Sequence, residues 1–138
     1  MTDIDGRNRV QRVATRPAVF VHANETLRAV AATLVEESIG AALVRGPHGA
    51  VGLVSERDIV RALADGADAD RTSASEVMAE ELVTVHSSDD LLDAVHRMLD
   101  NEVRHLPVQE GGVTLGMVSA RDALRAVTEE LETRAPTP

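Results

Sequence analysis

The chain contains, twice, a short pattern whose residue types could hold an anion and a ribose. The pattern is Gly-apolar-apolar-Ser-x-x-Asp, written GLVSERD at residues 52–58 and GMVSARD at residues 116–122. In both places an apolar run typical of a strand precedes it and a helical sequence follows, so the serine is expected at a helix N-terminus. Unpaired N–H groups and the positive end of the helix dipole favour a phosphate or a carboxylate at such a position.

The charged residues of the pattern extend this chemistry. Asp58 and Asp122 each follow the serine by three residues, so both carboxylates should face the end of the helix and could accept hydrogen bonds from a ribose diol. Arg57 and Arg121 could meet phosphate oxygens. A structural interpretation also stays open, because Ser-x-x-Asp is close to a capping box, in which the two residues satisfy each other's backbone N–H groups.

The elements that must position these residues are themselves repeated. Residues 13–63 align with residues 77–127 without a gap, at an offset of 64, with 13 identities in 51 positions. Each copy shows a β-prone run, an amphipathic helical stripe, two apolar runs around a glycine-bearing turn, and a closing helix. We predict an α+β fold with a β-α-β-β-α unit at residues 8–68, a second unit at 72–132 and a disordered tail at 133–138.

Two short helices cannot cover both faces of such a sheet. The copies are therefore expected to pack sheet to sheet with pseudo-twofold symmetry.

The doubled pattern and the order of the elements resemble the CBS-domain family, whose repeats end in Gly-apolar-apolar-Ser/Thr-x-x-Asp. The sequence VRHLPV at residues 103–108 is also similar to the family's second strand. The resemblance implies a regulatory or sensor module rather than an enzyme. Such a module binds AMP, ADP, ATP or a related adenosyl ligand in the cleft between its repeats, forms a disc-like homodimer and signals to a partner protein, here unknown.

The resemblance also implies which residues touch the ligand: the motif aspartates contact the ribose, the serines lie near phosphate, and apolar residues of the first two strands line the adenine. The residues implied are Val19, Ile39, Gly40, Ala41, Ser55, Arg57, Asp58, Val83, Val103, His105, Pro107, Ser119, Arg121 and Asp122. The first copy departs from the family pattern, because residues 38–44 lack its Arg-x-Leu-Pro sequence. We expect the first ligand position to be the weaker or emptier of the two.

Composition narrows the choice of partners and compartment. The net charge of −9 disfavours nucleic acid, and the absence of cysteine excludes disulfides and thiolate ligands. The N-terminal sequence lacks the apolar core of a signal peptide, and no run approaches the roughly 20 apolar residues that span a bilayer, so we predict a cytoplasmic protein without a membrane partner. All 14 basic residues are arginine, which suggests a GC-rich prokaryotic genome.

Other candidate sites are weaker. His22 and His86 occupy equivalent positions and could share a ligand role, but no second ligand follows at i+4, so we interpret them as turn residues and predict no metal site. No nucleophile with a base, paired carboxylates or metal triad supports an enzyme. The alternative function is a dimeric interaction or scaffold protein with empty clefts, in which the motif residues serve only as helix caps.

Overall fold

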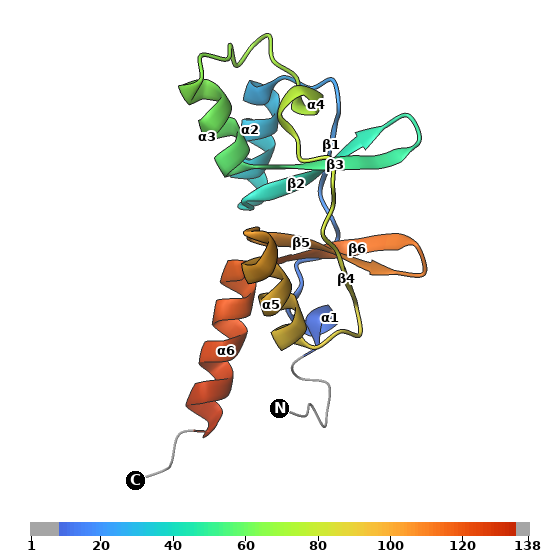
Figure 1. Cartoon of the computed structure of the whole chain (residues 1–138), viewed down its shortest axis with the longest axis vertical. Coiled ribbons are helices and arrows are strands. Elements are labelled where there is room, and N and C mark those ends of the chain that lie inside the picture. Colours follow the sequence, from blue (N-terminus) through green and yellow to red (C-terminus); the bar gives the residue numbers. More distant parts are fainter. Residues whose placement is uncertain (1–8, 135–138) are drawn as a thin grey trace. The chain divides into compact units, whose positions relative to one another are not determined.

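The computed structural model describes residues 9–134, which form two compact units (Figure 1). One unit is Val19–Leu82, and the other combines Met1–Ala18 with Val83–Pro138. The chain therefore passes between units at Ala18–Val19 and again at Leu82–Val83, which are equivalent places in the two repeats. Within the described residues, no helix is both long and apolar enough to cross a membrane.

The Val19–Leu82 unit is a three-stranded sheet with three helices. Its elements are β1 (Phe20–His22), α2 (Leu27–Glu37), β2 (Ala41–Gly46), β3 (Gly49–Ser55), α3 (Glu56–Ala64) and α4 (Ala74–Val77). The strand order is β1-β2-β3, with β1 parallel to β2 and β2 antiparallel to β3. The N-cap of α2 is Thr26, whose hydroxyl accepts a hydrogen bond from the Ala29 N–H at 3.2 Å.

The second unit repeats this design. Its elements are α1 (Val10–Val13), β4 (Val85–His86), α5 (Leu91–Asn101), β5 (His105–Glu110), β6 (Val113–Ser119) and α6 (Ala120–Arg134). The sheet order is β4-β5-β6, with the same parallel and antiparallel pairings. Even the register shift recurs, between Val44 and Arg45 in one sheet and between Val108 and Gln109 in the other. The α+β class and the doubled β-α-β-β-α unit are thus confirmed, while the sheet-to-sheet packing stays a prediction.

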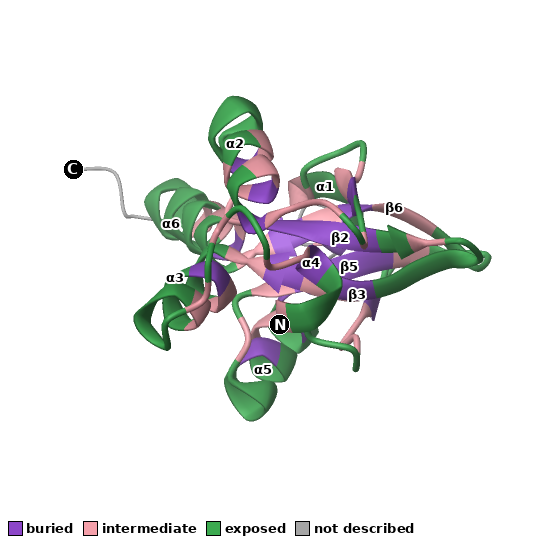
Figure 2. Cartoon of the chain, turned by 90° about the horizontal axis from the view of Figure 1, so that it is seen from above, coloured by how far each residue is buried: buried purple, intermediate pink, exposed green. Residues whose placement is uncertain are grey.

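Each unit has its own aliphatic core. In Figure 2 the strands are largely buried, whereas the helices are exposed along their outer sides. Buried side chains from the sheet pack against the inward stripe of the helices, for example Val30 and Leu34 of α2 in one unit and Ala94 and Met98 of α5 in the other. Burial of these apolar surfaces is the main favourable term holding the motif strands β3 and β6 in place.

The segment that leads into each repeat packs on the other repeat's unit. Val10 N donates to Asp89 O at 2.9 Å, and Thr15 forms a two-way antiparallel bridge with Met117 of β6. In the Val19–Leu82 unit, Ala74 N donates to Glu25 O at 2.9 Å, and Ala79 bridges Leu53 of β3 in the same way. The compact units therefore do not coincide with the continuous sequence repeats, and neither α1 nor α4 was expected from the sequence.

The last helix is longer than predicted. Helix α6 continues to Arg134, so residues 133 and 134, which we assigned to a disordered tail, are helical. The side chain of Arg134 pairs with Glu130 at 3.1 Å, an i, i+4 ion pair that favours the two extra helical residues, and the Thr133 hydroxyl donates to Glu129 O at 2.8 Å. The rest of the expected tail, residues 135–138, lies outside the described residues.

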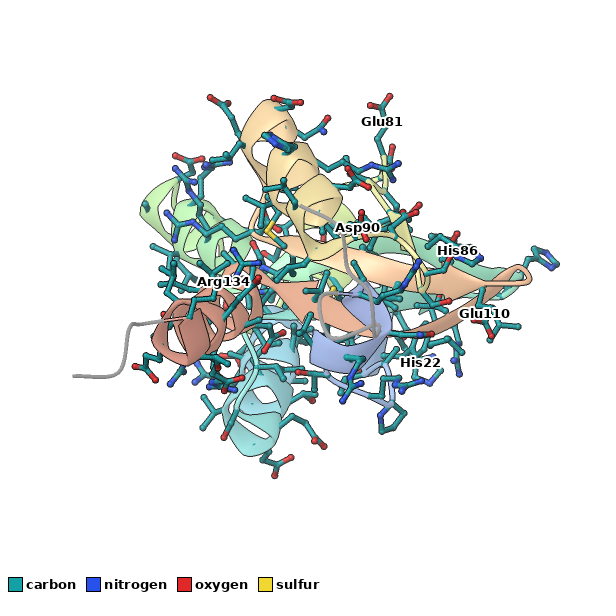
Figure 3. All side chains as sticks on the ribbon, turned by 90° about the horizontal axis from the view of Figure 1, so that it is seen from below. His22, Glu81, His86, Asp90, Glu110 and Arg134 are labelled. Atoms are coloured by element: carbon teal, nitrogen blue, oxygen red, sulfur yellow. The ribbon has the colours of Figure 1, made fainter. Side chains whose placement is uncertain are left out.

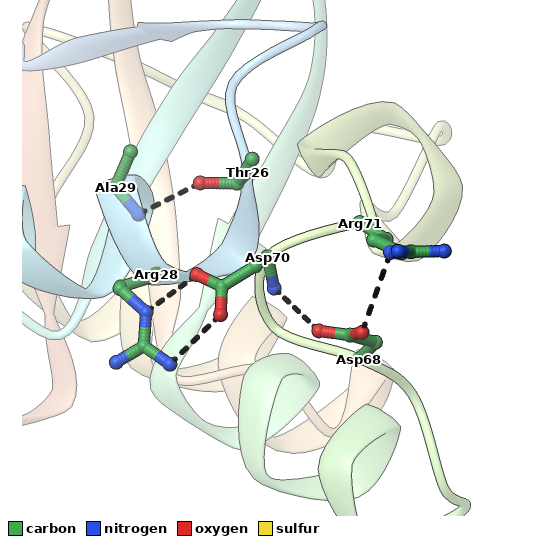
Figure 4. Close-up of polar contacts among 6 residues, drawn as sticks. All are labelled: Thr26, Arg28, Ala29, Asp68, Asp70 and Arg71. Atoms are coloured by element: carbon green, nitrogen blue, oxygen red, sulfur yellow. Dashed lines mark hydrogen bonds and ion pairs between the residues drawn. The ribbon is translucent and has the colours of Figure 1, made fainter.

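The segment of residues 65–75, called the link here, joins the two sequence repeats and contacts the start of α2 (Figure 4). Leu27 N donates to Thr72 O at 2.9 Å, and Arg28 N donates to Ala69 O at 3.1 Å. The Arg28 guanidinium also makes a two-pronged contact with Asp70, at 2.6 and 3.1 Å. Because two free N–H groups of the helix find acceptors in the link, the link acts as the N-terminal cap of α2.

The Arg28–Asp70 contact predicts a pH dependence. The hydrogen bond from Arg28 holds the pKa of Asp70 below its usual value. The contact therefore contributes its full stabilisation at pH values above the pKa of an aspartate in the unfolded chain, about 3.9. This stabilisation is lost as the pH falls through the lower pKa of Asp70 in the folded protein. We expect Asp70→Asn to be less stable than the parent protein at pH 7, with the difference shrinking towards pH 3. Urea titrations across this range would measure it, and Asp65→Asn is the control because Asp65 makes no side-chain ion pair within residues 9–134. A gap between Asp70→Asn and the parent that does not change with pH would contradict the prediction.

Candidate functional site

The first motif lies at the junction of β3 and α3, as predicted. Ser55 is the N-cap of α3, and its hydroxyl accepts from Asp58 N at 3.2 Å. In return, Asp58 Oδ2 accepts from the Ser55 N–H at 2.8 Å and from the Ser55 hydroxyl at 2.9 Å. The capping interpretation is therefore confirmed. It uses only one carboxylate oxygen, because within residues 9–134 Asp58 Oδ1 has no hydrogen-bond partner.

The second motif is capped in the same way but less completely. Asp122 Oδ2 accepts from Ser119 N at 2.9 Å, and Ser119 Oγ accepts from Asp122 N at 3.0 Å. Unlike Ser55, Ser119 does not donate its hydroxyl to the carboxylate, so among the described residues this hydroxyl proton is unused. Within residues 9–134 the second motif thus presents both a carboxylate oxygen, Asp122 Oδ1, and a hydroxyl donor that have no hydrogen-bond partner.

A left-handed residue at the end of each long helix brings the second strand to the motif. Ser38 has φ 55° and Glu102 has φ 54°, and each stops its helix directly before the residues predicted to contact the ligand. The Gly40 carbonyl then accepts from Glu56 N at 2.9 Å, and the Arg104 carbonyl accepts from Ala120 N at 2.8 Å. The residues before β2 and β5 therefore meet the motif residues at the start of α3 in one unit and of α6 in the other.

The strand pairings bring further predicted ligand-contact residues next to the motif serines. Ala41 pairs with Ser55, and His105 pairs with Ser119. Ile39 and Val103 are partly buried and pack against the cores of their units. The sequence-predicted residues thus gather as one set in the Val19–Leu82 unit and one in the other. The members of the first set are Val19, Ile39, Gly40, Ala41, Ser55, Arg57 and Asp58, and those of the second are Val83, Val103, His105, Pro107, Ser119, Arg121 and Asp122. Ala41 and Pro107 are the buried members.

Pro107 of the second copy removes a hydrogen bond to the residues directly before β4. In the first unit the Leu43 N–H donates to the Val19 carbonyl at 3.0 Å. Pro107 occupies the equivalent position in the second unit and has no N–H to donate. Within the described residues the Val83 carbonyl therefore receives no such bond, and it stays available as an acceptor.

The motif arginines are exposed and have no ion-pair partner within residues 9–134. This holds for Arg57 and Arg121, and also for Arg61 and Arg125, which lie one turn further along the same helices. Like charges at i and i+4 disfavour a helix, and Arg57 and Arg121, in the first turns of α3 and α6, also oppose the helix dipole, whereas Arg61 lies in the last turn of α3, where the dipole favours a cation. Such an arrangement, present in both copies, would be relieved by a bound anion. Sequence reasoning missed Arg61 and Arg125, although both are identities in the repeat alignment.

His22 and His86 are not the turn residues that we predicted but the last residues of β1 and β4, directly before the turns. His22 N donates to Glu25 Oε2 at 2.6 Å, and His86 N donates to Asp89 Oδ2 at 2.9 Å, so each acidic side chain closes the turn before a long helix. Both histidines are exposed (Figure 3). Within the described residues, no group of three or more histidine, cysteine, aspartate or glutamate side chains is placed to hold a metal ion.

Phe20 is the chain's only Phe, Tyr or Trp residue, and its ring already has a partner. The Arg45 guanidinium lies over it, 4.0 Å from the ring centroid.

The family assignment follows from the match of both repeats to one family model. The model describes a CBS domain, and it matches residues 10–65 and again residues 74–129. The chain belongs to the CBS-domain family. As a CBS-domain protein it is 32% identical over 113 residues to the mitochondrial CBS domain-containing protein CBSX3 of Arabidopsis thaliana, covering 78% of this chain and 55% of that one. It thus spans about half the length of that relative.

Solved CBS structures have the same fold. A CBS-domain containing protein from Agrobacterium tumefaciens, ATU1752, superposes with a TM-score of 0.85 at 27% identity, covering 92% of this chain and 98% of the other. The CBS domain protein PAE2072 from Pyrobaculum aerophilum, solved in complex with AMP, superposes with a TM-score of 0.78 at 32% identity, covering 91% and 98%.

Proposed function

We propose that this CBS pair is a regulatory module that binds an adenine nucleotide or a related adenosyl compound and signals to a partner protein. The observation that carries the proposal is the doubled cap. In both copies the motif aspartate caps its helix with one oxygen and keeps the other free, beside an exposed arginine. The AMP complex of the 32% identical PAE2072 supports adenosine as the ligand class.

Each group at the motif suits one part of such a ligand. The free Oδ1 of Asp58 or Asp122 can accept from a ribose hydroxyl, a charge-assisted bond. The neighbouring arginines and the helix N-terminus suit phosphate oxygens. Binding of the ligand between the two repeats, as the resemblance implies, stays a prediction.

The second copy is the better-equipped site. It offers the Val83 carbonyl, which Pro107 leaves without a donor, and this carbonyl could accept from the amino group of adenine. It also offers the unused Ser119 hydroxyl and the free Asp122 oxygen. In the first copy the Val19 carbonyl and the Ser55 hydroxyl already have partners. We therefore propose that ligand binds first, or only, through the second copy.

Calorimetric titration of the nucleotide-free protein tests the proposal. AMP, ATP, NAD and S-adenosylmethionine are the probes. We expect saturable binding of at least one, and tighter binding of ATP than of AMP if Arg121 and Arg125 act together on phosphates. No binding of any probe to the folded protein would favour the scaffold alternative, in which the motifs are caps alone.

A set of exposed apolar residues on the helices points to a second copy of this chain as a partner. Val35 of α2 and Val60 of α3 are 78% and 65% exposed, and their equivalents Leu99 and Leu124 are 69% and 70% exposed. Large exposed apolar side chains that recur on one kind of surface mark association sites. We propose that these helix faces form a homodimer, which is the assembly that the family resemblance implies.

Sedimentation measurements test the dimer. We expect the parent protein to be dimeric and Leu124→Glu to shift it towards monomer, because a carboxylate would be buried without a partner. Val113→Glu is the matched control, since Val113 is 59% exposed but lies on the β5–β6 hairpin rather than on a helix. A monomeric parent protein, or an equal effect of the two substitutions, would rule out the helix faces.

A further inference from the structure

The segment of residues 9–18, called the strap below, closes the second repeat although it precedes the first. Val10 of α1 is fully buried in the core of that unit, together with Val85 and Val108. Val10 N donates to Asp89 O at 2.9 Å, and Gln11 N donates to Ser87 O at 3.0 Å. The strap is therefore fixed at one end to the turn that precedes α5.

Its other end extends the motif strand. Thr15 N donates to Met117 O at 2.8 Å, and Met117 N donates to Thr15 O at 3.0 Å. Met117 belongs to the motif itself and precedes Ser119 by two residues. Without the strap, β6 would be an edge strand with unpaired backbone groups directly before the Ser119–Asp122 cap.

The strap buries little apolar surface. Val10 is its only fully buried side chain, and Val13 and Ala14 pack partly buried against the same core. The exposed residues are Gln11, Arg12, Thr15, Arg16 and Pro17. A segment with so little buried apolar surface opens locally at a lower free energy than the core around it. Beyond Ala18 the chain enters the first repeat at Val19, a residue predicted to contact ligand.

We infer that the strap is a coupling device: its docking on β6 keeps the Ser119–Asp122 motif ordered, and its release loosens that motif without unfolding the unit. Any event that displaces residues 9–18 would then loosen the second motif, whether it pulls on the strap from its N-terminal end or through Val19 at its C-terminal end. The proposal that the strap keeps the cap ordered is argued from the geometry alone, whereas the effect on ligand affinity rests on the proposed function.

The chain supplies a matched pair of variants. Thr15→Pro removes the donor to Met117, and Ala79→Pro removes the equivalent donor to Leu53 in the first repeat's unit. Both side chains are exposed, and the residues before them, Ala14 and Met78, already have the extended conformation that proline requires of its predecessor. Each substitution therefore tests one backbone contact in one unit.

Hydrogen exchange of the full chain, followed by NMR, reads out the two caps separately. The reporters are the Ser119 and Ser55 N–H groups, which donate to Asp122 and Asp58. We expect Thr15→Pro to speed exchange at Ser119 by about tenfold or more and to leave Ser55 unchanged, and Ala79→Pro to do the reverse. Unchanged exchange at Ser119, or equal acceleration at both sites, would overturn the coupling. If Thr15→Pro fails to fold, Val10→Ala is the milder variant with the same expected pattern.

A second measurement extends the test to ligand. If AMP binds through Asp122, Thr15→Pro should weaken its binding by about tenfold, and Ala79→Pro should leave it unchanged. Faster exchange at Ser119 with no binding of AMP, ATP, NAD or S-adenosylmethionine by the parent protein would uphold the coupling and contradict the proposed function. Unchanged affinity in a variant whose cap is loosened would overturn control of the site by the strap.

Discussion

Replacement of Asp122 by alanine should weaken AMP binding by about 10- to 100-fold. The free Oδ1 is expected to accept from the ribose, and a hydrogen bond to a charged group contributes about 1.5–3 kcal/mol, with about 1.4 kcal/mol for each factor of ten. The same change removes the N3 partner of the α6 cap, so the free energy of unfolding should also fall, by about 0.5–2 kcal/mol. Calorimetric titration and urea denaturation measure the two effects separately.

The chain contains a cap that separates these two roles. At Ser73, which precedes α4, Glu76 Oε2 accepts from the Ser73 N–H at 2.7 Å and from its hydroxyl at 3.1 Å, much as Asp58 does at Ser55. Glu76→Ala should therefore lower stability and leave AMP affinity unchanged. Asp58→Ala should have a smaller effect on affinity than Asp122→Ala. If Asp122→Ala behaves like Glu76→Ala, the motif aspartate is a cap only, and the scaffold alternative is preferred.

Replacement of Gly116 by alanine should destabilise the second repeat's unit by about 1–3 kcal/mol, the usual cost of forcing extra atoms into a packed site. A Cβ at Gly116 would lie 2.3 Å from the Thr15 carbonyl oxygen and 2.6 Å from Arg16 Cγ. The carbonyl belongs to the backbone of the strap, so the clash can be relieved only by a backbone shift of the strap or of β6. Because the chain has no Trp or Tyr, circular dichroism in urea is the suitable measurement.

Two other glycines calibrate this effect. At Gly52 a Cβ would meet the Met78 sulfur at 2.5 Å and the Ala79 carbonyl oxygen at 2.8 Å, so Gly52→Ala should also be destabilising, although the Met78 side chain can move aside. At Gly46 the nearest atom is Val51 Cγ1, a side-chain atom at 3.1 Å, so Gly46→Ala should cost less. Equal stability of Gly116→Ala and Gly46→Ala would refute the close approach of the strap to β6.

The fold therefore explains why the motif begins with glycine. The sequence singled out Gly52 and Gly116 as part of a repeated pattern resembling a ligand-binding family. In the fold, both are the places where another chain segment crosses a motif strand, Met78–Ala79 in one unit and Thr15–Arg16 in the other. Their lack of a side chain is needed for that crossing, whatever the ligand.

Much of this protein was determined by the sequence alone. The offset of 64 residues, the apolar periodicities and the Ser-x-x-Asp pattern predicted two β-α-β-β-α units and the capped strand-to-helix junctions, because these depend on interactions between residues close together in the chain. The sequence also showed that the second copy differs at Pro107. The loss of the donor to Val83 could not be deduced without the pairing of the strands.

The tertiary structure decided what the sequence could not. A repeat alignment assigns residues 13–18 to the first copy and 77–82 to the second, yet in the fold each segment completes the other copy's sheet. That choice depends on contacts between residues about 100 positions apart, such as Thr15 with Met117, which leave no local periodicity in the sequence. It likewise decided that one oxygen of each motif aspartate is used in capping and the other is free, since this depends on side-chain geometry at the end of the helix.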